Sequence, residues 1–170
     1  RKENFRNLYE EAYEFALPQR NLYDGHYEGK VGGNKKMGRV FDSTAINSTQ
    51  RFANRMQSGI FPPQRKWCRL EPGTDIPVER RGEAQMALDT YSEKMFSALK
   101  QSNFDIAIGE FLLDLSVGTA VMMVQPGDDI NPINFIAVPQ YLVSFEEGAD
   151  GQVDNVYRRI RMKGESIQRQ

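Results

Sequence analysis

The segment FDSTAINSTQRFANRMQSGIFPPQRKWCRL, residues 41–70, is the most informative part of the chain. Asp42 or Ser43 predicts a helix start, because a short oxygen-bearing side chain accepts hydrogen bonds from amides of the first turn. Small and apolar residues then recur at three- and four-residue spacing, which places them on one helical face. Pro62-Pro63 ends the helix, and an extended segment that contains Trp67 follows.

Length and composition limit the classes of protein to consider. The chain has 170 residues, enough for one domain with a core, and 39% of them are hydrophobic. The net charge of −1 argues against a dedicated nucleic-acid or membrane binder. The single cysteine, Cys68, excludes a disulfide within the chain and fits a reducing compartment. No apolar run reaches the roughly 20 residues that a membrane-spanning helix needs, so we expect no membrane partner.

The first half of the chain is predicted to be helical, with one irregular stretch between the N-terminal helix and the later helices. Apolar spacing predicts an N-terminal helix over residues 1–17, which ends where Leu17 precedes a proline. Residues 18–41 form a loop rich in glycine and lysine. Residues 42–117 are the helical part, and its last helix, almost wholly apolar from residue 104, should be the buried helix.

The second half changes to strands. Residues 118–163 contain short apolar or alternating runs separated by Pro, Gly and Asp turns, which predict an antiparallel β-meander. The run at residues 119–125 is continuous and apolar, as expected for a strand covered on both faces. Asp150-Gly151 predicts a hairpin. Helices followed by an antiparallel meander indicate the α+β class, here as a single domain over residues 1–170.

A cluster of basic residues between Lys30 and Arg69 is the most unusual charge feature. Asp42 is its only acidic residue. Such a patch attracts DNA phosphates, but the near-zero net charge and the lack of a known nucleic-acid-binding motif favour a solvated face or a contact with an acidic neighbour. The candidate residues for subunit or DNA contact are Lys30, Lys35, Lys36, Arg39, Arg51 and Arg55.

The sequence also predicts which large side chains are buried and whether a metal or catalytic site can form. Phe52, Phe111 and Leu115 lie on apolar helix faces and should be largely buried, and Trp67 is the large aromatic anchor of its segment. The lone histidine and lone cysteine offer no metal set and no Cys–His pair. The sequence therefore predicts no enzyme, no metal and no cofactor.

The order of motifs resembles a known family. A D-S-T-A helix start, F-P-P and W-x-x-L in the first half are followed by V-G-T-A-V-M-M-V, F-I-A-V-P-Q-Y-L-V-S-F-E and D-G-Q-V-D-N-V-Y-R-R. This collinear order resembles the portal, or head-to-tail connector, proteins of short-tailed bacteriophages. The resemblance covers about residues 17–163, and its motifs are patterns of fold and not of chemistry.

The resemblance implies a structural role. Members form a ring of about twelve copies at one capsid vertex. DNA is packaged and ejected through the ring, and capsid protein, terminase and a tail adaptor bind it. The chain would be the wing region of a longer protein. That protein would be located in the virion and assembled in the host cytoplasm. The alternative is a stand-alone nucleic-acid-binding module that uses the basic loop at residues 30–39.

Overall fold

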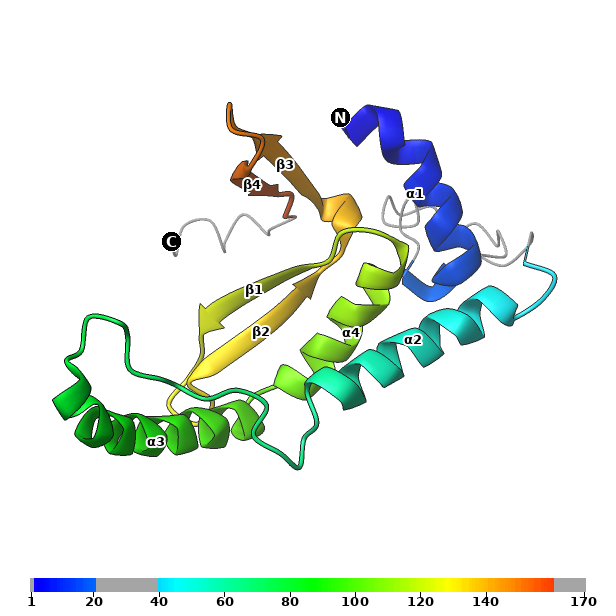
Figure 1. The fold of residues 1–170 in the computed structure, drawn as a ribbon. Helices are drawn as coiled ribbons and strands as arrows, with labels where there is room; N and C mark the ends of the chain where they lie inside the picture. The colour runs from blue at the N-terminus through cyan, green and yellow to red at the C-terminus, as the bar shows by residue number, and fades with distance from the viewer. Residues whose placement is uncertain (1, 21–39, 161–170) are drawn as a thin grey trace. The chain divides into compact units, whose positions relative to one another are not determined.

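The structure, a computed structural model, describes residues 2–20 and 40–160 and has an α+β fold (Figure 1). Its helices are α1 Lys2–Ala16, α2 Thr44–Ile60, α3 Val78–Gln101 and α4 Phe104–Val117, with short 3-10 helices at Pro18–Arg20 and Gln140–Leu142. Its strands are β1 Val121–Pro126, β2 Ile133–Val138, β3 Val143–Glu147 and β4 Val153–Arg158. The predicted order of helices before antiparallel strands is therefore confirmed.

Side chains that cap the helices explain where they begin. The Thr44 amide donates to Asp42 Oδ1 at 2.8 Å, so Asp42 caps α2 as expected. The Phe104 amide likewise donates to Ser102 Oγ at 3.2 Å before α4. Helix α2 continues through Gly59 to Ile60, just before the double proline.

The chain divides into two compact units. The first contains Arg1–Thr49, Asp114–Val121 and Val138–Gln170, and the second contains Gln50–Leu113 and Met122–Ala137. Both are discontinuous in sequence, because α2, α4, β1 and β2 each pass from one unit into the other.

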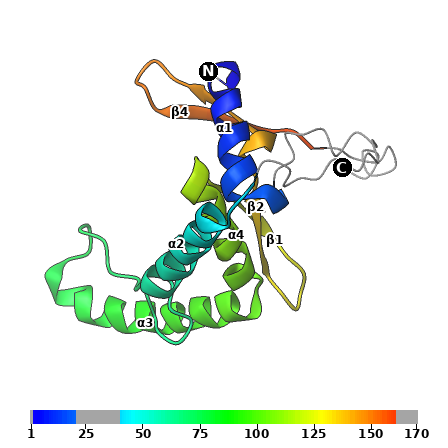
Figure 2. The same ribbon diagram turned by 90° about the vertical axis from the view of Figure 1, so that its right-hand side faces the viewer.

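The second unit has an apolar core between α2 and α4, which lie side by side in Figures 1 and 2. Ala53, Ile108 and Leu112 are its buried members, and Met56 and Phe111 are among the partly buried residues that pack against them. The burial of a single stripe on α2 follows from its amphipathic spacing.

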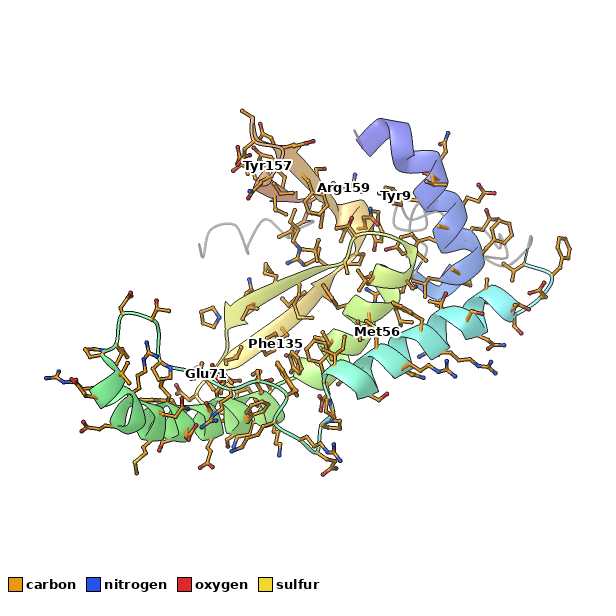
Figure 3. All side chains as sticks on the ribbon, in the orientation of Figure 1. Tyr9, Met56, Glu71, Phe135, Tyr157 and Arg159 are labelled. Atoms are coloured by element: carbon orange, nitrogen blue, oxygen red, sulfur yellow. The ribbon has the colours of Figure 1, made fainter. Side chains whose placement is uncertain are left out.

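An aromatic cluster extends this core. The Trp67 ring stacks on Phe104 with centroids 5.7 Å apart, and Phe61 meets Trp67 edge-on at 5.0 Å. Phe104 also meets Phe135 of β2 edge-on at 5.1 Å. The Asn103 side chain exchanges two hydrogen bonds with the Phe135 backbone, at 2.7 and 2.9 Å, which fixes β2 beside the start of α4. Figure 3 labels Phe135 on its strand.

The first unit contains a buried charge. The Asp114 side chain is 1% exposed, yet it accepts a hydrogen bond from the Tyr13 hydroxyl at 2.9 Å. The second carboxylate oxygen pairs with Arg20 Nη2 at 2.8 Å. Leu17, Val138 and other apolar residues of this unit are also buried. A buried carboxylate needs such partners, because desolvation of an unpaired charge is costly.

The strands form two separate two-stranded ribbons, β1–β2 and β3–β4, where the sequence indicated one meander. The first ribbon turns at Gly127, whose amide donates to the Pro132 carbonyl at 2.9 Å. The expectation that residues 119–125 form a strand covered on both faces is wrong, since the end of β1 from Val124 is exposed. A two-stranded ribbon has no further strands or helices to cover both faces along its whole length.

Two of the four expected core anchors are not buried. Phe52 is 38% exposed and Leu115 is 40% exposed, so the prediction for these two residues is wrong. On α2 the buried residues are Thr49 and Ala53, and on α4 they are Ala107, Ile108, Leu112 and Asp114, so Phe52 and Leu115 lie next to buried positions without being buried themselves. Because α4 has apolar residues on more than one side, packing on one side leaves other apolar residues outside. Phe111 and Trp67 are half-buried.

Candidate assembly surfaces

The outward face of α2, defined here by Gln50, Arg51, Asn54, Arg55 and Ser58, is polar and exposed. Helical spacing places these residues opposite the buried stripe. The helix contains no acidic residue. Within the described part of the chain no ion pair involves either arginine of this face. Both guanidinium groups are therefore available to an anionic partner.

A second group of cations from the basic cluster is already paired. Arg69 forms two hydrogen bonds with the Asp89 carboxylate of α3, at 2.9 and 3.0 Å. Lys66 Nζ lies 3.1 Å from Glu93 Oε1, one turn further along α3. The hydrogen bond from Arg69 lowers the pKa of Asp89, with a smaller contribution from Gln85. These cations thus hold the extended segment on α3.

Backbone contacts reinforce this attachment. The Leu70 amide donates to Ser92 Oγ at 3.2 Å, and Gln85 Nε2 donates to the Leu70 carbonyl at 3.2 Å. A shallow hollow on this surface is lined by Lys66, Trp67, Cys68, Arg69, Asp89, Ser92 and Glu93. Because its four charged residues pair with one another, the hollow offers no unpaired charge to a ligand or substrate.

The β3–β4 hairpin presents an apolar face outside the core. Phe145 pairs directly with Val156, and Val153 lies opposite Glu147 after an irregularity in the register. Phe145 is 41%, Val156 54% and Val153 57% exposed. The turn is the expected one, with Gly151 at a φ of 79°, a conformation that favours glycine.

The other face of the hairpin is polar and internally bonded. Glu146 accepts hydrogen bonds from the Tyr157 hydroxyl at 2.7 Å and from Asn155 Nδ2 at 3.1 Å. These bonds lower the pKa of Glu146 and the first of them raises the pKa of Tyr157. Tyr157 is labelled on the hairpin in Figure 3.

The structure brings together only part of the predicted contact set. Arg51 and Arg55 lie one turn apart on the outward face of α2, as the helical spacing predicts. Lys30, Lys35, Lys36 and Arg39 lie outside the described residues. Sequence reasoning missed the exposed apolar face of the hairpin. Its signal was the alternation of apolar residues in two strands next to a predicted turn.

Over residues 2–20 and 40–160, no three or more His, Cys, Asp or Glu side chains are grouped as a metal site would require. None of the helices in those ranges has the length and hydropathy of a membrane span.

Comparison with known proteins places the chain in a family. No curated protein matches the sequence significantly. The family model described as bacteriophage head to tail connecting protein matches residues 1–170. This match confirms the resemblance that the order of motifs indicated. The chain therefore belongs to the family of bacteriophage head to tail connecting proteins.

Proposed function

We propose that the chain is a wing region of a portal ring at one capsid vertex, through which phage DNA is packaged and ejected. The ring has about twelve copies, in keeping with closed cyclic symmetry. Its further partners are the capsid protein, the terminase and a tail adaptor. The protein acts as a virion component by assembly and not by catalytic turnover, and it assembles in the host cytoplasm.

The observation that best supports this proposal is the presence of two chemically different exposed surfaces. One is the outward face of α2, with its two arginines, and the other is the apolar face of the β3–β4 hairpin. A closed ring needs two different complementary surfaces on each subunit, whereas a two-fold dimer needs one self-complementary surface. Exposed apolar residues gathered on one element are a recognised mark of an interaction site.

Electron microscopy of the complete gene product tests the proposal. We expect closed rings with a central opening, and a native mass equal to about twelve subunits. A single subunit mass at high protein concentration, with no rings in the images, would contradict the proposal.

Duplex binding tests the alternative of a nucleic-acid module that uses residues 30–39. For the portal, we expect only weak binding of a labelled duplex by the chain at physiological salt, because the net charge of −1 supplies little attraction. A module that neutralises four phosphates would instead show log affinity falling with log salt at a slope near −3.6. Tight binding with such a slope, abolished by Lys35→Glu together with Lys36→Glu, would favour the nucleic-acid module.

A further inference from the structure

The basic residues of α2 and of the segment after it fall into two groups, one paired with acidic residues of α3 and one in no described ion pair. Residues 44–69 contain five cationic residues and no acidic one. Lys66 and Arg69 are paired with acidic residues of α3. Arg51 and Arg55 on the outward face of α2, together with Arg65, keep a positive charge that no described ion pair balances.

The β3–β4 hairpin has the opposite charge. Residues 143–158 contain the acidic residues Glu146, Glu147, Asp150 and Asp154 and one basic residue, Arg158, which gives a net charge of −3. The two hydrogen bonds to Glu146 favour its ionised form. The hairpin thus combines an apolar face with an acidic end.

The two surfaces also match in length, and an exposed apolar residue lies beside the face of α2. The strands have five and six residues, which corresponds to a length of about 17–20 Å. The part of α2 from residue 50 to residue 60 is about 16 Å long at 1.5 Å per residue. Phe52 borders its outward face and is exposed, so it can contact the apolar face of the hairpin.

We propose that the β3–β4 hairpin of one copy of this chain docks on the outward face of α2 of a neighbouring copy. The apolar face, with Phe145, Val153 and Val156, covers Phe52, and the acidic end faces Arg51 and Arg55. This inference rests on the proposed ring, because it names the contact that joins neighbouring subunits within it.

The charges of the two surfaces favour a head-to-tail contact with a neighbouring copy over a two-fold contact or a contact with DNA. Two hairpins facing each other bring like negative charges together, and two α2 faces bring arginines together, which disfavours two-fold contacts through either surface. DNA could pair with the arginines, but a polyanion cannot bind the acidic hairpin as well, so the apolar face would stay uncovered. A head-to-tail contact of hairpin with helix satisfies both surfaces and can close into a ring.

A charge-swap experiment on the complete gene product tests the contact. One variant carries Arg51→Glu with Arg55→Glu, a second carries Glu147→Lys with Asp154→Lys, and a third combines all four changes. Mass photometry measures the concentration at which half of the subunits are assembled. Each reversal should raise this concentration by about tenfold or more, and the combination should restore it to within about threefold of the unmodified protein.

A matched control reverses two exposed acidic residues of α3, Glu79→Lys with Glu83→Lys, which lie outside both proposed surfaces. It should assemble like the unmodified protein. Circular dichroism checks that each variant is folded, and all four substituted side chains are exposed.

The outcomes separate the contact from the ring itself. If the unmodified protein assembles but the reversals do not change the half-assembly concentration, the contact is refuted and the ring proposal stands. If the control weakens assembly as much as the reversals, or the combination fails to restore it, the contact is also refuted. If the unmodified protein stays monomeric, both proposals fail.

Discussion

Replacement of Asp114 by alanine is the sharpest test of the folded core. The Asp114 side chain is 1% exposed, and its carboxylate contacts the Tyr13 hydroxyl at 2.9 Å and Arg20 Nη2 at 2.8 Å. Asp114→Ala removes the only carboxylate that these contacts use. The Arg20 side chain, itself only 19% exposed, then loses its ion pair with this carboxylate.

The cost of Asp114→Ala follows from this geometry. Breaking a buried ion pair by removing one partner typically costs about 3–5 kcal/mol, because an uncompensated charge stays inside. Tyr13→Phe deletes only the hydrogen bond to the carboxylate and leaves the ion pair, which should cost about 1.5–3 kcal/mol. We therefore expect Asp114→Ala to be the more destabilising change. Against a domain stability of about 5–15 kcal/mol, it removes a large fraction of the total.

Urea titration followed by circular dichroism measures the free energies of unfolding. Asp129→Ala is the matched control, since Asp129 is an exposed turn residue, and it should change the stability by no more than about 0.5 kcal/mol. A loss below about 1 kcal/mol for Asp114→Ala would refute the reasoning. So would a loss for Tyr13→Phe equal to that for Asp114→Ala, since the ion pair would then contribute nothing.

Two further predictions concern the second unit. Gly127→Ala should destabilise it by about 1–3 kcal/mol, because the added Cβ would collide with the Asn131 carbonyl oxygen. Gly82→Ala in α3 meets no atom within 4 Å and should instead stabilise the chain by about 1 kcal/mol. Urea titration compares both glycine variants, and equal effects would contradict the prediction. The pKa of Asp89 is lowered in the folded chain from an ordinary 3.8, so its contact with Arg69 should persist above that value and be lost as the pH falls through the lowered pKa. An NMR titration of the Asp89 carboxyl carbon measures this pKa, and Arg69→Ala should raise it towards the ordinary value. A pKa unchanged by Arg69→Ala would contradict this prediction.

The helices were largely predictable from the sequence because local signals specify where they begin and end. Asp42 caps α2 as expected, Ser102 caps α4 through an equally local contact, and the double proline at residues 62 and 63 follows the end of α2. These signals act within one or two turns, so no knowledge of the tertiary structure is needed. The turn at Gly151 was predictable for the same reason.

The buried pair of Asp114 and Tyr13 could not be predicted in this way. The two residues are 101 positions apart, and nothing local distinguishes an aspartate that ends an apolar helix from a solvated one. The same limit explains the errors for Phe52 and Leu115. An apolar spacing shows which residues share a helix face, but it does not show whether residues at the edges of that face are covered by neighbouring elements. The division of the strands into two ribbons also depends on contacts that lie far apart in sequence.

The candidate contact residues divide according to the acidic residues near them in space. In sequence, Arg51, Arg55, Lys66 and Arg69 belong to one basic cluster. In the structure the last two are neutralised by α3, and the first two face outward without a described ion pair. Among the described residues of this cluster, the positive charge that no ion pair balances is therefore smaller than the sequence indicates, and it comprises Arg51 and Arg55 of α2 together with Arg65. A DNA-binding protein would gain from keeping all four cations free of acidic partners. A chain with a net charge of −1 that separates small basic and acidic surfaces is better suited to bind another protein subunit through complementary charges.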